Sequence, residues 1–523
     1  MGSAAAVIDD DERAPLLTSG SSQRSAPASD TGAAPASAGT YAVPCLLLQH
    51  VSSTINAGLY DFGAFLFLID IFADTLVPSA LVGLFTTLSG LLLSGYIGGL
   101  VDRTPRLRFL RRAIGAEKFF HGANYALFLL LFGPLQPVAS AAFHFRASTA
   151  QNVAVWACLL LTIMCSSLLG LANTGLTVAI ERDWVTCIAR GDTALLTQLN
   201  TYMRRIDLVS KLVSPLLVSF LTVMWGYEVA VAILLAFTVV TAATESVWIG
   251  VVYRCFPALS RQDHGAVEAA VGHVVAESTE DGAPEVLVIA APTTRRTWSQ
   301  WFAQEKADWA EFVRLPVFGS SVAIATIYLT TLSYDGTFIA YVKAARGYDD
   351  TFIAGMRAVC LVTGLLGTAL MPLLERAVGL ERAGAWSIWS EVVCLSPVVV
   401  SFFYGAGAYG EHGPSWNTGL LFGGIALSRI GLWSFDLCQL KVLQLALDDH
   451  PRRNRMTALQ IALQNLFNLA KYAVTLAAAT PAQFKWTALV SWFAVVAGAG
   501  CYAAYLRSVR GHLVHVTWLK KLY

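Results

Sequence analysis

The stretch WTALVSWFAVVAGAGCYAAY, from Trp486 to Tyr505, is predominantly apolar and contains no charged side chain. An α-helix of about 20 residues spans roughly 30 Å, the thickness of the hydrocarbon core of a bilayer. Similar runs recur along the 523-residue chain, in which only 14% of residues are charged. One such run is compatible with a buried helix of a soluble protein, but a long series of them predicts an all-α polytopic membrane protein.

The apolar runs predict about twelve transmembrane helices. Their approximate bounds are 43–72, 76–101, 113–137, 151–180, 204–226, 228–254, 314–343, 350–374, 383–405, 415–447, 456–478 and 483–507. A long polar segment separates six spans from the other six, as in major facilitator transporters, whose two lobes enclose a central cavity. The predicted organisation is a disordered tail at 1–40, a first six-helix lobe at 41–254, a cytosolic loop with an interfacial helix at 255–313, a second six-helix lobe at 314–507 and a cytosolic tail at 508–523.

Positive charge gathers in the loops that follow the even-numbered spans. These loops carry, among others, Arg103, Arg182, Arg376 and Arg452, whereas the odd-numbered loops have few cations. Lysine and arginine are enriched in short cytosolic loops of membrane proteins. The distribution therefore predicts that both termini lie in the cytosol.

Two segments outside the spans carry signals of their own. The segment ERAPLL at 12–17 resembles an acidic dileucine sorting signal for endosomal, lysosomal or vacuolar delivery, although so short a pattern also arises by chance. In the central loop, Trp298, Trp301, Trp309 and Phe312 recur at helical spacing, opposite a polar face. This pattern predicts a helix at the membrane interface.

Composition argues against several other classes of protein. The net charge is +1, so no nucleic-acid partner is expected. The nine cysteines include no CxxC pair, which argues against a disulfide framework or a zinc site. Neither a P-loop nor a nucleophile–base arrangement is present in the sequence. We therefore expect neither an enzyme nor a bound cofactor.

Polar side chains inside the first predicted span point to a site in the first lobe. Asp61 lies midway along this span, and Asn56, Thr54 and His50 lie on earlier turns. A charged side chain inside the membrane costs roughly 2.5–3.5 kcal/mol and so needs a partner or a function. Carboxylate, amide and hydroxyl oxygens suit divalent ions. We predict a metal or proton site at Asn56 and Asp61, with structural pairing as the alternative. Glu245 either completes this site and takes part in proton coupling or has a structural role, and a structural role is expected for His50.

A second site is predicted where the segment YDGT at 334–337 interrupts span seven. Glycine weakens the helix there, and freed carbonyl groups can coordinate a cation, as in the broken helices of transporters. Asp335 supplies the negative charge, so we predict a metal site; a kink capped by Asp335 is the alternative. In span eleven, Lys471 either couples protons by competing with the cation or pairs with a carboxylate.

Charged residues at the predicted cytosolic ends of the helices are expected to form a gate of ion pairs. Asp102 and Arg103 belong to the segment GGLVDRTPR at 98–106, which resembles the loop signature of major facilitators. Arg429 and Asp436, two turns apart in span ten, are expected to form a structural or gating network. The complete predicted gating set is Asp102, Arg103, Arg182, Asp183, Arg204, Arg205, Asp207, Arg429 and Asp436.

Several strings of the sequence resemble signatures of the ferroportin family. The most specific is RIGLWSFD at 429–436, which contains two aromatic residues. The others are RDW at 182–184, RRID at 204–207, LSYD at 332–335 and QN at 464–465. The matches lie in both halves of the chain, which identifies it as resembling this family over most of its length.

The resemblance implies a major-facilitator-like fold and a transport function. Ferroportins move divalent metal, chiefly ferrous iron, out of the cytosol by alternating access, with proton antiport in characterised members. The partners that it implies are a divalent metal ion, with iron first, and the lipid bilayer. Family exporters often occupy the plasma membrane, whereas the dileucine segment would direct the protein to a vacuolar or endolysosomal membrane.

The sequence departs from the animal members at the positions of their metal ligands. Ala57 stands where their first span has an aspartate, and Asp61 stands where it has a histidine. Gly336 replaces the metal-binding cysteine of span seven, which is also the docking point of hepcidin, so control by hepcidin is not expected. Span eleven lacks the ligand histidine; Asn465 is the candidate ligand there, near Asn468 and Lys471. Oxygen-rich ligands leave manganese, cobalt and nickel open beside iron.

Three functions are therefore compared. The first is export of ferrous iron or a similar divalent metal, which the family strings and the intramembrane acids favour. The second is a major facilitator that carries an organic solute, in which Arg429 or Lys471 binds an anion. The third is a receptor or scaffold, which only the long loop and the sorting segment support.

Overall fold

The computed structural model describes residues 36–72, 77–260, 298–333, 336–406, 411–477 and 483–510. These residues are almost entirely helical, and no strand occurs among them. Eight helices in the described part are long and apolar enough to cross a membrane, and a pair bent by 100° between Arg314 and Phe318 raises the number to nine. The all-α polytopic membrane fold is confirmed, whereas the count of twelve spans stays a prediction.

The helices form two compact units that are each interrupted in sequence. The amino-terminal unit contains Pro35–Leu315 and Leu447–Ala479, and the carboxyl-terminal unit contains Pro316–Ala446 with the segment from Thr480 onward. Helix α16 (Arg453–Ala477), which corresponds to predicted span eleven, packs against α2 (Val77–Arg103) in the amino-terminal unit. The sequence-based prediction instead places α16 in the second lobe, at 314–507.

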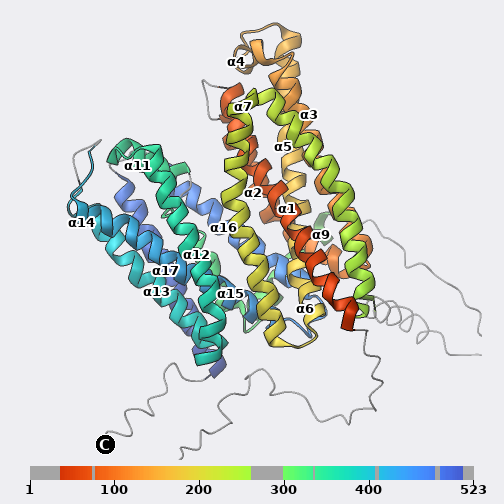
Figure 1. Cartoon of the computed structure of the whole chain (residues 1–523), viewed down its shortest axis with the longest axis vertical. Helices are drawn as coiled ribbons and strands as arrows, with labels where there is room; N and C mark the ends of the chain where they lie inside the picture. The colour runs from red at the N-terminus through yellow and green to blue at the C-terminus, as the bar shows by residue number, and fades with distance from the viewer. Residues whose placement is uncertain are drawn as a thin grey trace, which may run out of the picture. The chain divides into compact units, whose positions relative to one another are not determined.

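Long helices build most of the amino-terminal unit (Figure 1). Besides α2 and α16, they are α1 (Ala36–Ile71), α3 (Arg106–Phe132), α5 (Thr149–Thr177) and α7 (Thr193–Cys255). Shorter elements are α4 (Ala139–Phe143), the π-helix Val178–Trp184, α6 (Val185–Ala189) and α9 (Trp298–Arg314). Helix α1 begins inside the segment predicted as a disordered tail. Helix α7 is two helices joined at Gly226, whose φ of 78° breaks the helical path, in agreement with the predicted boundary between spans five and six.

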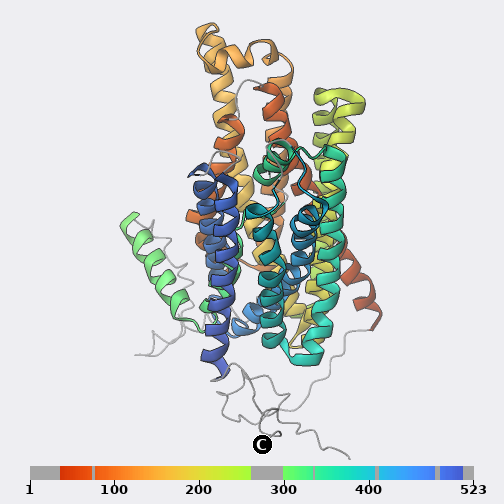
Figure 2. The same ribbon diagram turned by 90° about the vertical axis from the view of Figure 1, so that its left-hand side faces the viewer.

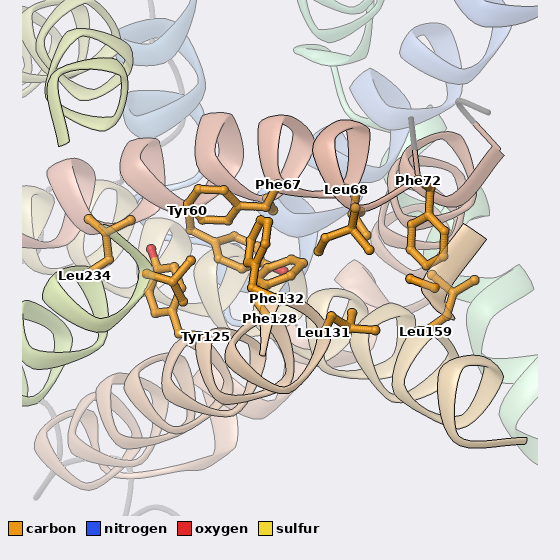
Figure 3. Close-up of a cluster of buried hydrophobic side chains, with 14 of the residues drawn as sticks. Tyr60, Phe67, Leu68, Phe72, Tyr125, Phe128, Leu131, Phe132, Leu159 and Leu234 are labelled. Carbon is orange, nitrogen blue, oxygen red and sulfur yellow. The ribbon is translucent and has the colours of Figure 1, made fainter. Parts of the chain in front are cut away.

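Aromatic packing holds α1 against α3 in this unit (Figure 3). Phe67 of α1 meets Phe128 edge-on at 5.5 Å between ring centroids, and Phe132 stacks on Tyr227 of α7 at 5.5 Å. Edge-on and offset aromatic pairs add about 0.5–1.5 kcal/mol each beyond the area they bury. This cluster fixes the part of α1 that carries Tyr60 and Asp61.

The carboxyl-terminal unit is a second helical bundle, in which α12, α13, α15 and α17 run side by side (Figure 1, Figure 2). Its helices are α10 (Phe318–Ile327), α11 (Gly336–Arg346), α12 (Asp350–Val378), α13 (Leu380–Phe403), α14 (Ser415–Thr418), α15 (Gly424–Ala446) and α17 (Phe484–Arg510). A Cβ atom at Gly431 would lie 2.6 Å from the carbonyl oxygen of Ser387, so the backbones of α13 and α15 touch.

Predicted span seven is broken in the structure. Helix α10 ends at Ile327 and α11 begins at Gly336, and Tyr334 and Asp335 lie outside the described residues. The backbone between the two helices is bound by side chains: Ser491 accepts the Thr331 N–H at 2.9 Å, and Arg429 donates to the Leu332 carbonyl oxygen. Backbone groups that leave a helix inside a membrane protein need such partners.

Candidate functional site

A cavity of about 400 Å³ opens beside Asp61 in the amino-terminal unit. Helices α1, α2, α5 and α16 supply its walls. Its lining residues are Tyr60, Asp61, Ala64, Phe65, Leu68, Ser79, Val82, Gly83, Thr86, Thr87, Ser166, Leu169, Gly170, Asn173 and Tyr472. Asp61 is the one charged side chain among them, and it is exposed to the cavity rather than packed in the core.

The cavity offers oxygen ligands around this carboxylate. Hydroxyl groups of Ser79, Thr86 and Thr87 and the amide of Asn173 share its wall. The Tyr60 hydroxyl is fixed by a hydrogen bond of 2.6 Å with the Ser166 hydroxyl. A carboxylate among hydroxyl and amide oxygens suits a hard or borderline divalent cation. The arrangement can bind such an ion without sulphur ligands.

The structure does not bring Asn56 and Asp61 together. Asn56 is only 2% exposed and faces α7, where its amide donates to the Thr241 hydroxyl at 3.1 Å. Glu245 of α7 is fully buried and accepts a hydrogen bond of 2.6 Å from Ser52. Asn56 and Glu245 therefore belong to the α1–α7 contact and not to the wall of the Asp61 cavity.

His50 lies in a second group of ligand-type side chains, with Glu181 and Asp207. Their ligand atoms lie within 4.8 Å of one another, and the His50 Nε2 atom is 2.9 Å from Asp207 Oδ1. Arg204 also donates to the other oxygen of Asp207 at 3.0 Å. Because a guanidinium already neutralises Asp207, this group has the partners of an ion-pair network. The structural role of His50 stays a prediction.

Asp183 and Asp102 anchor the amino-terminal end of α16. The Asp183 carboxylate, only 1% exposed, receives Arg106 through two hydrogen bonds of 2.6 and 3.0 Å and is also bound by Arg453. Asp102 of α2 accepts the backbone N–H groups of Asn454 and Arg455 at 3.2 and 3.0 Å. Since the first N–H groups of a helix have no partner within it, Asp102 caps α16.

Helix α9 is tied to the same end of α16 by ion pairs. Arg455 contacts Glu305 at 2.8 Å and also Asp308, a fully buried side chain, and Arg452 contacts Asp308 at 2.5 Å. A helix is thus present where the aromatic pattern predicts one; its location at a membrane surface stays a prediction.

His450, in the turn before α16, is held by two polar contacts. Burial lowers its pKa below the usual value, with Asp102 opposing the shift. The neutral ring accepts the Arg452 N–H at Nδ1 (3.1 Å) and lies 3.3 Å from Glu311 through Nε2. These contacts fit the tautomer that carries its proton on Nε2.

The remaining predicted site residues occupy separate places. Arg103 ends α2, Arg182 lies in the π-helix before α6, Arg205 lies on α7, and Asp436 lies on α15 beyond Arg429. Asn465 of α16 packs against Gly90 of α2, where a Cβ would come within 2.6 Å of its Nδ2 atom. Lys471 lies 5.2 Å from the ring of Tyr472, which lines the Asp61 cavity. None of these positions tests a role in transport.

Three ionisable side chains of predicted span three are absent from the predicted site. Glu117, Lys118 and His121 are all buried in α3 and gather near Glu245. Their spacing of one and four residues places Glu117 and His121 on one helical face. Glu117 and His121 lie four residues apart within an apolar span. This spacing of two ionisable residues is the sequence signal by which the group could have been found.

Comparisons with known proteins agree with this architecture. The Ferroportin1 family model matches residues 41–495. The chain is 30% identical to solute carrier family 40 member 1 of Oryza sativa subsp. japonica over 475 residues, which covers 90% of this chain and 92% of that protein. It is 22% identical to human ferroportin over 531 residues, covering 89% and 91% of the two chains.

The fold is shared with solved structures. A bacterial homologue of the iron transporter ferroportin in an outward-facing state aligns with a TM-score of 0.67 at 18% identity, covering 89% of this chain and 99% of that chain. The same kind of homologue in an inward-facing state aligns with a TM-score of 0.56. The major-facilitator-like helical fold is therefore confirmed. Since the family model spans most of the sequence, this multi-pass membrane protein belongs to the ferroportin family.

Proposed function

We propose that this protein exports ferrous iron or a similar divalent metal from the cytosol by alternating access, with proton coupling. Its family consists of membrane transporters, and relatives with the same fold include a bacterial homologue solved with soaked iron. The observation that carries the proposal is the Asp61 cavity, whose described lining combines one carboxylate with hydroxyl and amide groups. The metal is the substrate, so no resident cofactor is needed.

Asp61 is the proposed ligand in the amino-terminal unit. Its carboxylate is the only negative charge among the described residues that line the cavity, and a cation that leaves water needs such compensation. Asp335 and Asn465 are retained as proposed ligands elsewhere, with Asp335 outside the described residues. The proposed gate uses the ion pairs of Asp183 and the backbone contacts of Asp102 at the end of α16.

Replacing Asp61 with asparagine should reduce metal flux at least about tenfold, because even groups that only orient a metal ligand contribute about 10–100-fold to affinity. The measurement is uptake of ferrous iron, cobalt, nickel or manganese into liposomes that contain the purified protein. Asp70→Asn is the matched control: it makes the same change on the same helix at an exposed position outside the cavity. Wild-type protein that carries none of these metals under any proton gradient would refute the proposed function.

We also propose that both termini lie in the cytosol, from the distribution of arginine among the loops. The host membrane is the plasma membrane or, if the segment at 12–17 acts, a vacuolar or endolysosomal one. A Leu16→Ala/Leu17→Ala variant imaged in cells should move to the plasma membrane in the second case. An unchanged location would remove this segment from consideration.

Control by hepcidin is not part of the proposal. Gly336, the first residue of α11, stands where the resemblance places the cysteine that docks the hormone. Glycine has no side chain and so offers no thiol to a peptide ligand.

A further inference from the structure

Four ionisable side chains meet in the interior of the amino-terminal unit. Glu117 and His121 of α3 and Glu245 of α7 are 0% exposed, and Lys118 of α3 is 5% exposed. The Lys118 ammonium lies 2.7 Å from Glu245 and 3.4 Å from Glu117, and the His121 Nδ1 atom lies 3.8 Å from Glu117. We call these four residues the α3–α7 cluster.

The charges of the α3–α7 cluster do not balance. Two carboxylates face one ammonium, so the cluster carries a net charge of −1 when both glutamates are ionised and His121 is neutral. Among the described residues, the other helices that pack on α3 show no further cation at the cluster: α5 has no charged residue, α2 has charges only at Asp102 and Arg103 at its end, and α1 presents Ser52 and Tyr60. An isolated buried charge is strongly unfavourable, so one bound proton restores neutrality.

Several polar atoms of the cluster can accept that proton. Glu117 Oε2, Glu245 Oε2 and both ring nitrogens of His121 are buried without a hydrogen-bond partner among the described residues. Buried polar atoms are almost always paired, so each orphaned atom needs an explanation. The two carboxylate oxygens are unpaired acceptors, whereas the neutral His121 ring has one acceptor nitrogen and one N–H donor. A proton on either carboxyl group, or on the acceptor nitrogen of the ring, supplies a further donor.

Tyr60 connects the α3–α7 cluster with the Asp61 cavity. Its ring meets His121 edge-on at 5.2 Å between centroids, while its hydroxyl is bonded to Ser166 in the cavity wall. The cluster thus lies one aromatic side chain behind the place where the proposed metal binds. A metal ion bound at Asp61 repels a proton on the cluster, because the protein interior between them has a low dielectric constant and screens charge weakly.

We propose that the α3–α7 cluster binds the proton that is exchanged for the metal. This inference rests on the proposed function. The metal arrives beside Asp61, the proton leaves a glutamic acid of the cluster, and the remaining carboxylate charge balances part of the metal charge. When the metal departs on the far side of the membrane, a proton from that side binds the carboxylate again. Lys118 holds the two glutamates together throughout.

The test measures metal and proton movement in the same liposomes, with cobalt(II) as the transported ion and an enclosed pH dye. In Glu117→Gln the cluster is neutral without a proton, so proton movement per metal should fall at least about tenfold while downhill cobalt uptake persists. Glu245→Gln leaves the Glu117–Lys118 pair and should have the same effect, which covers the case in which one variant fails to fold. Glu228→Gln, at an exposed position of α7, is the matched control and should keep the wild-type ratio.

Proton movement at the wild-type ratio in a folded Glu117→Gln or Glu245→Gln variant would overturn the inference. So would wild-type cobalt uptake without any proton movement, which would leave the proposed metal transport intact. Absence of flux for every metal in the wild-type protein would instead remove the proposed function itself. Coupled wild-type flux with uncoupled flux in both variants supports both proposals.

Discussion

Replacing Asp183 with asparagine should destabilise the amino-terminal unit by about 3–5 kcal/mol, the usual penalty for removing one partner of a buried ion pair. The carboxylate is 1% exposed and binds Arg106 and Arg453, whose side chains are only 12% and 13% exposed. Asparagine keeps the size of the side chain but removes the buried negative charge that Arg106 and Arg453 both contact. The measurement is thermal unfolding of the purified protein in detergent, together with metal flux.

Asp448→Asn is the control for this prediction. Asp448 lies 3.4 Å from Arg453, but the Asp448 side chain is 49% exposed. Exposed ion pairs contribute about 0–1 kcal/mol, so the control should unfold near the wild-type temperature. An Asp183→Asn variant as stable as this control would show that the buried pairs do not hold α16 in place.

The substitution Gly98→Ala, which adds a single methyl group to α2, should push α2 away from α16. A Cβ atom there would lie 2.5 Å from both the Asn454 carbonyl oxygen and the Ala458 Cβ, and 2.9 Å from the Arg455 Cα. Backbone atoms cannot rotate away as a side chain can, so Gly98→Ala forces the helices apart. Overpacking of this kind costs about 1–3 kcal/mol. The shift also draws the Asn454 and Arg455 amides away from Asp102, so we expect both lower stability and lower flux.

The matched control is Gly115→Ala on α3, where a Cβ would meet no atom within 4 Å. Alanine favours a helix over glycine by about 1 kcal/mol, so this variant should be as stable as the wild type or slightly more stable. If the two alanine variants unfold at the same temperature, the close approach of α2 and α16 is not what stabilises this unit.

The fold was largely accessible from the sequence because membrane helices are selected by length and hydropathy, both of which are local properties. The break at Gly226 illustrates this, since the apolar run there is too long for one span and glycine interrupts it. The assignment of α16 to the amino-terminal unit was not accessible. It depends on packing against α2, more than three hundred residues earlier, and no local pattern reports such a contact.

The site was only partly predictable, for a geometric reason. Asp61 was identified because a carboxylate in a membrane helix is rare. Asn56 precedes it by five residues, which at 3.6 residues per turn rotates it by about 140° away, so it faces α7 instead of the cavity. Arg453 could be placed near a helix end, but its pairing with Asp183 joins positions 270 residues apart.

The closure of the amino-terminal unit by α16 has a consequence for biosynthesis. Asp102 is synthesised 352 residues before the amide of Asn454 that it caps, and Asp183 is synthesised 270 residues before Arg453. At roughly 5–20 residues per second, translation takes on the order of tens of seconds to supply these partners. The first helices of the amino-terminal unit are therefore inserted before α16, which completes their bundle, has been synthesised. A premature stop near residue 450 leaves the Asp183 carboxylate without one of its arginines, so late truncations damage the part of the protein that the ribosome makes first.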